Sequence, residues 1–259
     1  METETGAITH VTFGTKEFRQ AIGLLKRTAS RYGVKDVRIY GPEHGAIMKL
    51  AREQPGIMSQ RRGAGYWLWK PTILLHAMAS LPDGAIVIYT DAGVAYDASP
   101  SPLVQLLRTE DVITFSNFPT HLQRIWTKRD CFILLGADRQ EEWERRQLDA
   151  AVLLIRNSAR ARELLTEWGA AMADPRVLTD QPNECGLPNL DGFIEHRHDQ
   201  SVLTIVAARN AVPVLPMPMH RRSKQMPYGA IFLQHRMRDD VPRSEWLRLA
   251  NRLRVAPWV

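Results

Sequence analysis

Hydrophobic residues occur along the chain both in short continuous runs and at helical spacing, which is typical of an α/β protein. The clearest run, residues 85–89, is apolar and partly β-branched, which favours a strand covered on both faces. Residues 16–32 carry apolar side chains at helical spacing between two short apolar runs, residues 8–13 and 37–40. Strand, helix, strand is the unit from which parallel sheets are built, so the pattern predicts a mostly parallel central sheet.

The same reading predicts the remaining elements. Further strands are expected at residues 112–115, 131–135, 150–156, 212–215 and 230–233. Helices are expected at residues 45–54, 72–80, 103–107, 122–130, 140–147, 158–173, 201–208 and 245–253. Residues 55–65 and 174–193 are rich in glycine, proline and polar residues, and are predicted to be loops. The second loop is long, and a long irregular connection inside a compact domain is often functional.

The strand at residues 85–89 runs directly into Thr90, Asp91, Ala92 and Gly93. Open α/β sheets bind ligands at the carboxyl ends of their strands, so Asp91 is the first candidate for chemistry. The alternative is that Asp91 only caps a turn, which is common for an aspartate at a strand end.

A dense group of ionisable residues precedes the helix expected at residues 201–208. It contains Glu195, His196, Arg197, His198 and Asp199, followed by Gln200. A structural alternative exists, in which Asp199 caps the helix and Arg197 pairs with Glu195. Capping needs only one of these residues, which favours a functional interpretation of the others.

Aromatic residues gather just before the helix expected at residues 72–80. Tyr66, Trp67 and Trp69 lie within four positions and are followed by Lys70. They are either core residues or the wall of a pocket, where Lys70 would be the polar group that contacts the ligand. Core packing explains the rings better than it explains Lys70, because a lysine is rarely buried without a partner.

Charge and composition narrow the classes of function. The net charge of +6 and the pI near 9.5 favour an anionic partner, which leaves a nucleotide diphosphate, nucleic acid and an anionic membrane surface open. No apolar run approaches the length of a membrane span, and the first ten residues are polar. Cys131 and Cys185 lack metal-ligand spacing and indicate a reducing compartment, so a cytoplasmic protein is expected. The phosphate-loop, dinucleotide, hydrolase-elbow and zinc-protease motifs are all absent.

Three segments in order resemble nucleotide-sugar-dependent glycosyltransferases of the GT-A fold. They are IYTDAG at residues 88–93, DAAVLLIR at residues 149–156 and HDQSVL at residues 198–203. The resemblance is closest to the glycogenin-like retaining group and to related bacterial polysaccharide glycosyltransferases, and extends from about residue 11 to residue 235. It implies a Rossmann-like, three-layer α/β fold and a single domain over residues 1–259. Residues 1–115 would form the nucleotide-binding half and residues 116–259 the acceptor and catalytic half.

The resemblance also implies the site residues. Those implied to bind the donor are Thr12, Phe13, Gly14, Lys70, Asp91, Ala92, Gly93 and Arg236. Those implied to be catalytic are Asp199, Gln200 and His198. Further cations available to the leaving diphosphate are Arg61, Arg221, Arg222 and Lys224. Tyr66, Trp67 and Trp69 are candidates to stack on donor or acceptor rings.

One position departs from the family pattern. Members hold a divalent cation, Mn²⁺ or Mg²⁺, between the two acids of Asp-x-Asp, the donor diphosphate and often a late histidine. Gly93 replaces the second acid here, which leaves Asp91 and His235 as candidate ligands. A hard cation with one carboxylate would depend on diphosphate oxygens, water and an imidazole, so metal dependence is in question.

The implied activity is a retaining hexosyltransferase. It would move a sugar from a nucleotide diphosphate sugar, such as a UDP-sugar, to a glycan or lipid-linked acceptor in bacterial surface polysaccharide synthesis. The positive charge is concentrated late in the chain, in residues 220–224 and 235–238, and this basic segment would rest on the anionic inner face of the membrane. A sugar-phosphate nucleotidyltransferase stays open as an alternative, although residues 14–16 match its glycine-rich signature poorly. A basic nucleic-acid-binding module also stays open, but few aromatic residues lie near the basic segment, so no nucleic-acid partner is expected.

Overall fold

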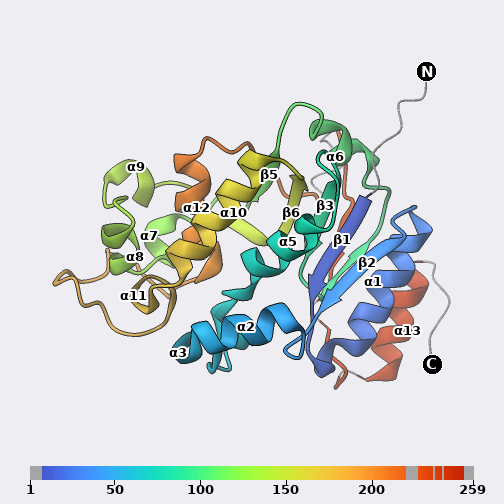
Figure 1. Ribbon diagram of the computed structural model, residues 1–259, viewed down its shortest axis with the longest axis horizontal. Coiled ribbons are helices and arrows are strands. Elements are labelled where there is room, and N and C mark those ends of the chain that lie inside the picture. The colour runs from blue at the N-terminus through green and yellow to red at the C-terminus, as the bar shows by residue number, and fades with distance from the viewer. Residues whose placement is uncertain (1–7, 220–226, 236, 241, 254–259) are drawn as a thin grey trace.

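The computed structural model describes residues 8–219, 227–235, 237–240 and 242–253 of the 259-residue chain. Within these residues a mixed sheet has the strand order β2-β1-β3-β6-β5-β7, in which β6 alone runs antiparallel to its neighbours (Figure 1). Its strands are β1 (Ile8–Phe13), β2 (Asp36–Tyr40), β3 (Ile86–Thr90), β5 (Val112–Ser116), β6 (Leu148–Arg156) and β7 (Val214–Pro216). A separate antiparallel pair is formed by β4 (Val94–Tyr96) and β8 (Phe232–Gln234). The mostly parallel α/β sheet predicted from the sequence is therefore confirmed.

Helices lie on both faces of this sheet. The longer ones are α1 (Arg19–Arg31), α2 (Gly45–Glu53), α5 (Trp69–Ala79), α10 (Ala159–Met172), α12 (Asp199–Arg209) and α13 (Arg243–Arg252). The shorter ones are η1 (Lys16–Phe18), α3 (Pro55–Met58), α4 (Gly63–Tyr66), α6 (Ser101–Leu106), α7 (Gln123–Trp126), α8 (Arg129–Leu134), α9 (Gln140–Trp143) and α11 (Pro175–Leu178).

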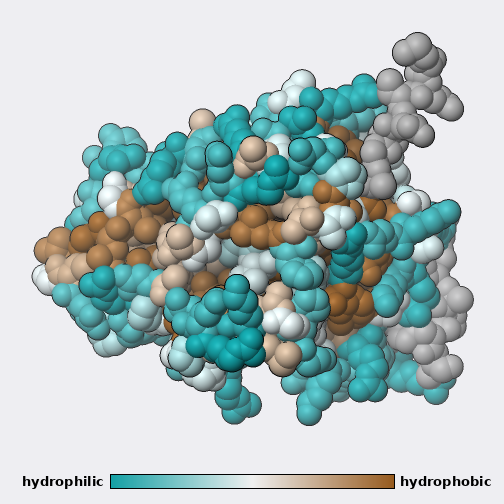
Figure 2. All heavy atoms as spheres, in the orientation of Figure 1, coloured by the Kyte–Doolittle hydropathy of each residue, from teal (hydrophilic) through white to brown (hydrophobic). Residues whose placement is uncertain are grey.

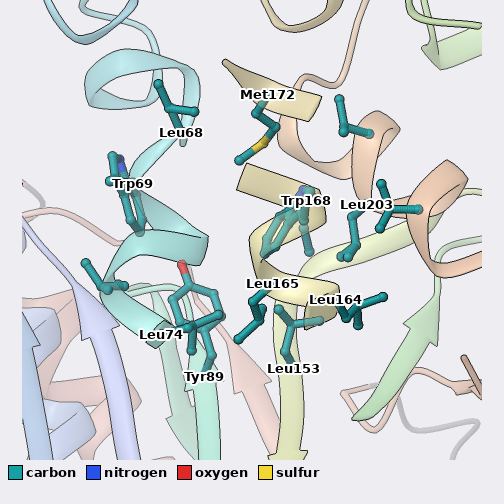
Figure 3. Packing of buried hydrophobic residues seen from close by; sticks show 14 of the residues in the cluster. Leu68, Trp69, Leu74, Tyr89, Leu153, Leu164, Leu165, Trp168, Met172 and Leu203 are labelled. Carbon is teal, nitrogen blue, oxygen red and sulfur yellow. The ribbon is translucent and has the colours of Figure 1, made fainter. Parts of the chain in front are cut away.

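Alternate residues of β3 enter two different hydrophobic clusters, which defines the layers. Val87 and Tyr89 belong to the cluster that contains α5, α10 and α12, whereas Ile86 and Ile88 belong to the one that contains α1 and α6. Figure 3 shows part of the first cluster, with Trp168 of α10 beside Leu203 of α12. This cluster draws on residues from β1 to α12, so both halves of the sequence share one core.

The following sequence-based assignments need correction. The apolar run at residues 131–135, predicted to be a strand, lies mostly in α8, where Cys131 and Phe132 face the core. A short apolar run does not distinguish a buried strand from a buried helix, which explains the error. The helix predicted at residues 122–130 is broken, because Thr127 and Lys128 are extended between α7 and α8. Residues 55–65, predicted to be a loop, contain α3 and part of α4.

Residues 63–67 form a turn of left-handed backbone, here called the left-handed turn. All five residues have positive φ, from 50° at Ala64 to 97° at Gly65, and Tyr66 and Trp67 have φ of 52° and 60°. Consecutive left-handed residues are rare because each side chain crowds the following carbonyl oxygen. The turn leads directly into α5 and so sets the position of the first residues of that helix.

The visible face of the molecule is mainly hydrophilic. Figure 2 shows hydrophobic residues at the end that holds α8 and α11, across the middle of this face and near β1. Leu187 and Ile194, in the long loop between α11 and α12, are 45% and 65% exposed.

Over the part of the chain that the structure describes, none of the helices combines the length and the apolarity that a membrane span requires.

We predict that Gly65→Ala destabilises the fold by about 2–4 kcal/mol, because the added methyl meets both a steric and a conformational obstacle. A Cβ at Gly65 would lie 2.9 Å from the Cα of Met58, and the residue has φ of 97°. Urea unfolding measures the loss. Gly56→Ala is the control, since a Cβ there meets no atom within 4 Å. Equal stability of the two variants would contradict the prediction.

Candidate functional site

The ammonium group of Lys70 lies at the centre of a buried cluster of oxygen atoms. Its Nζ is 2.7 Å from Oδ2 of Asp199 and 3.3 Å from Oδ1 of Asp91. It also donates a 3.0 Å hydrogen bond to the carbonyl oxygen of Ala150. Lys70 is only 2% exposed, so these three oxygens replace the water that an ammonium would otherwise bind. We call Lys70, Asp91 and Asp199 the lysine cluster.

Four elements bring the cluster together. Asp91 follows β3, Lys70 is in the first turn of α5, and Asp199 is the first residue of α12. Because β6 is antiparallel, its first residues lie at the same edge of the sheet as the end of β3. There the backbone N–H of Asp91 donates to the carbonyl of Ala151 at 3.0 Å. The indole of Trp168 in turn donates to the backbone carbonyl of Asp199 at 3.1 Å, which fixes the start of α12.

Asp91 is the member of the cluster that solvent reaches. Its side chain is 36% exposed, whereas those of Lys70 and Asp199 are 3% and 6% exposed. The phenol of Tyr89 donates a 2.6 Å hydrogen bond to Oδ1 of Asp91, the oxygen that also faces Lys70. The orientation of the Asp91 carboxylate is thus set by two buried side chains.

The charges in the cluster shift its pKa values. Burial raises the pKa of Asp199 to about 6, although the Lys70 ammonium acts in the opposite direction. Burial alone would lower the pKa of Lys70, but the carboxylates of Asp199 and Asp91 outweigh it and raise that pKa. Lys70 therefore stays charged. Above about pH 6 the cluster holds two carboxylates and one ammonium, a net negative charge.

A glutamine pair extends the site at the start of α12. The amide of Gln200 donates to Oε1 of Gln147 at 2.6 Å. Gln147 is itself buried, and its amide donates to Oε1 of Gln123 and to the hydroxyl of Ser201, both at 3.0 Å. Gln147 was missed by sequence reasoning, because a glutamine that ends a charged segment gives no signal of a buried network.

His198 occupies an unusual position immediately before Asp199. Its φ is 49°, its Nδ1–H donates to the carbonyl of Leu178 at 2.8 Å, and its ring lies against those of Tyr66 and Trp67. Burial lowers the pKa of His198 to about 4.

The structural alternative considered for this segment is half correct. Arg197 does pair with Glu195, at 2.8 Å. However, Asp199 does not cap α12: it is the first helical residue, and its carboxylate faces Lys70.

The structure places the residues at the end of β1 beneath the site. Thr12 is fully buried and its hydroxyl donates to the carbonyl of Thr90 at 2.8 Å. Phe13 stacks on Trp69 with ring centroids 4.0 Å apart, so neither ring is free to stack on a ligand. Gly14 is only half-buried and Ala92 is buried.

His235 lies next to the loop after β3, but its ring has other contacts. Its backbone N–H donates to the carbonyl of Gly93 at 2.9 Å, its Nδ1 accepts from Met237 and its ring packs on Trp246. Among the described residues, no three His, Cys, Asp or Glu side chains gather as metal ligands. With Oδ1 of Asp91 already bonded to Tyr89, this donor set does not fit a cation held by protein side chains alone.

The remaining predicted cations are only partly placed. Arg61 is exposed, and its neighbour Arg62 pairs with Asp180 at 3.2 Å and Glu195 at 3.0 Å. Four others lie outside the described residues: Arg221, Arg222, Lys224 and Arg236.

Comparison with known proteins gives matches among solved structures alone. No family model and no curated protein matches the chain. It is similar to the apo structure of the bifunctional glycosyltransferase WbbM, with a TM-score of 0.50 and 12% identity over 85% of this chain and 40% of that one. It is also similar to the galactosyltransferase LgtC in complex with donor and acceptor sugar analogues, with a TM-score of 0.49 and 13% identity over 97% of both chains. A third match is a glycosyltransferase involved in glycosylation of the major capsid of PBCV-1, with a TM-score of 0.49 and 13% identity over 92% of this chain and 97% of that one.

These comparisons bear on the fold. The chain spans 40% of the length of WbbM, and the matched region has the same α/β architecture. Together with the strand order, the likeness to WbbM confirms the GT-A fold that the sequence resemblance implies.

We predict that Lys70→Met destabilises the protein by about 3–5 kcal/mol at neutral pH, because it leaves Asp199 buried without a counter-charge. The pKa of Asp199, already raised to about 6, should rise further. The folded state then binds a proton more tightly than the unfolded state. The free energy of unfolding should therefore fall as pH rises from the ordinary aspartate pKa, about 4, to the raised pKa of Asp199 in the folded variant.

Urea unfolding at several pH values measures this loss. Lys49→Met is the matched control, because Lys49 is 71% exposed and its pairing with Glu53 should contribute little. A pH-independent loss in Lys70→Met would rule out the proposed role of Asp199.

Proposed function

We propose that this chain is a glycosyltransferase that moves a sugar from a nucleotide diphosphate sugar to an acceptor hydroxyl. The observation that carries the proposal is the lysine cluster, in which one buried ammonium joins the acid at the end of β3 to the acid that opens α12. The GT-A fold supports it, because solved structures with this architecture include glycosyltransferases. At the identities found, the activity itself is our inference from the site.

The charge of the cluster suits the sugar carbon that reacts. Breaking the bond between a sugar and a phosphate leaves positive charge on the anomeric carbon and negative charge on the diphosphate. A site with net negative charge stabilises the first of these, and Asp199 is held rigidly by Lys70 for this purpose. The half-exposed amide of Gln200, anchored by Gln147, lies beside it and supplies a polar contact for the sugar.

The leaving diphosphate needs positive charge from elsewhere. Lys70 is already balanced by two carboxylates, so it orients Asp91 and Asp199 rather than neutralising the donor. We assign the neutralising role to Arg236, Arg221, Arg222 and Lys224, which lie outside the described residues. The described side chains do not fit a metal held without the donor, and no step of the proposed reaction depends on one.

We extend the proposal to finer points on the strength of the motif resemblance. The donor would be a UDP-hexose, transfer would retain the anomeric configuration, and the acceptor would be a glycan or lipid-linked sugar of bacterial surface polysaccharide. The Asp199-Gln200 pair at the entrance of α12 supports this. We place the protein in the cytoplasm, with its basic segment against the anionic inner membrane face.

A panel of nucleotide sugars tests the donor class by thermal shift, with and without manganese. A donor that binds only the folded state must raise the melting temperature. No shift with any nucleotide sugar would contradict the proposal. Release of pyrophosphate from a nucleoside triphosphate and a sugar phosphate would instead favour the nucleotidyltransferase alternative.

We expect Asp199→Asn and Asp91→Ala each to reduce sugar transfer by about 100-fold or more, because each removes a charge placed at the reacting atoms. Release of nucleotide diphosphate measures turnover, and circular dichroism checks that the variants fold. Asp83→Asn is the control, since the Asp83 side chain is 82% exposed and, within the described residues, pairs with Arg162 at the surface. Full turnover in both site variants would refute the assignment.

The pH dependence follows from the raised pKa of Asp199. Its carboxylate must be ionised to stabilise the sugar cation, so kcat should rise with pH through about 6 and level off above it. The control Asp83→Asn should keep this profile. A kcat that is constant down to about pH 4.5 would mean that Asp199 ionises as an ordinary aspartate or is not used.

A further inference from the structure

His198 adopts a backbone conformation that glycine normally occupies. Its φ and ψ are 49° and −118°, which for a residue with a Cβ carry a conformational penalty. Backbone strain of this kind persists only where the surrounding structure enforces it, and strained residues are frequent at functional sites. A glycine would fill the turn without strain, so the imidazole itself must serve a purpose.

One ring nitrogen of the imidazole has no hydrogen-bond partner in the part of the chain that the structure describes. Nδ1–H donates to the carbonyl of Leu178, so Nε2 of the neutral ring carries a lone pair. The side chain is 1% exposed, and among the described residues Nε2 has no hydrogen-bond partner. It faces Oδ1 of Asp180 at 3.6 Å, which is a second acceptor. Because burial lowers the pKa of His198 to about 4, the imidazole is neutral at neutral pH.

Aromatic and charged side chains surround this pair. The ring centroids of Tyr66 and Trp67 lie 4.6 and 5.7 Å from that of His198, and burial and the nearby Asp180 carboxylate raise the pKa of the Tyr66 phenol. Arg62 binds the other carboxylate oxygen of Asp180 at 3.2 Å. Trp67 is half-buried and the Asp180 side chain is 40% exposed, so the edge of the group reaches solvent.

We propose that His198 and Asp180 form a subsite for the hydroxyl groups of a pyranose, with Trp67 against the ring. A buried acceptor without a donor is costly, and a ligand hydroxyl that donates to Nε2 would remove that cost. Adjacent hydroxyls on a sugar suit two adjacent acceptors, and an indole face suits the C–H groups of the ring. A site that requires a hydroxyl strongly rejects an analogue without it, so the subsite would set sugar specificity.

The position in the chain ties this subsite to the proposed function, on which it rests. Asp199 of the lysine cluster is the next residue after His198, and the left-handed turn that carries Tyr66 and Trp67 leads into Lys70. The sugar bound there is therefore one of the two that react, either the donor hexose or the acceptor. The chemistry is the same for both, and the experiment separates them.

Asp180→Asn is the most informative variant. Its amide can donate a hydrogen bond to Nε2 of His198 and so satisfy that atom inside the protein. The melting temperature of the free protein should be equal or higher, and the affinity for the sugar should fall by about tenfold or more. The control is Asp83→Asn, another surface aspartate paired with an arginine.

His198→Gly tests the strained residue itself. It relieves the backbone but deletes the imidazole, so the fold should persist while sugar affinity falls by a similar factor. Ala211→Gly is the matched control, because Ala211 also has positive φ, 51°, is exposed, and lies at the far end of α12. It should leave sugar affinity unchanged.

Two arms of measurement identify the sugar. In the donor arm, calorimetry compares UDP with UDP-glucose and UDP-galactose: a loss confined to the nucleotide sugars assigns the subsite to the donor hexose. In the acceptor arm, KM is measured for p-nitrophenyl glucosides and galactosides: a rise there assigns it to the acceptor. If both variants leave both arms unchanged, the subsite does not exist.

A separate result would concern the proposed function. If the wild type binds no nucleotide sugar, the proposed transfer fails. The subsite is then judged by thermal shift with glucose and galactose alone. A shift in the wild type that Asp180→Asn abolishes would support it, and the absence of a shift would overturn it.

Discussion

A buried ammonium needs a complete shell of oxygen atoms, and this requirement organises the centre of the molecule. Removing the Lys70 ammonium from water costs on the order of several kcal/mol unless hydrogen bonds and opposite charge replace the lost hydration. Asp199, Asp91 and the Ala150 carbonyl provide this shell, and they come from α12, the end of β3 and β6. The ends of these elements therefore cannot shift independently. Precision at the candidate site follows from the needs of one side chain.

The reversed direction of β6 makes this shell geometrically accessible. In a fully parallel sheet the first residues of β6 would lie at the opposite edge from Asp91. Running antiparallel, β6 instead pairs Thr90 with Val152 and brings Ala150 beside Lys70. Gln147, just before β6, then meets Gln200 and Ser201 at the start of α12. The antiparallel direction of β6 thus brings the lysine cluster and the Gln147–Gln200 pair into one site.

Local sequence signals predicted part of this arrangement. The apolar run ending in Asp91 and the ionisable group before α12 were both visible, because strand ends and helix entrances have clear local patterns. The resemblance placed Lys70, Asp91 and Asp199 in one site, but the ion pairs that join them were not visible, since they depend on contacts between residues far apart in the sequence. The left-handed turn was also missed: two of its five residues are glycines, but nothing local requires Tyr66 and Trp67 to follow in the same conformation. The strand misassigned at residues 131–135 has the same cause, since tertiary packing determines how a short apolar run folds.

The sequence separation of Lys70 and Asp199 has a consequence for how the protein folds. Contacts between distant segments close a long loop and tend to form late. The oxygen shell of the ammonium is complete only when α5, β6 and α12 are all docked. A partly folded chain then has no assembled site, and its unpaired acids stay hydrated. The contacts that order the candidate site are therefore complete only in molecules whose core is assembled.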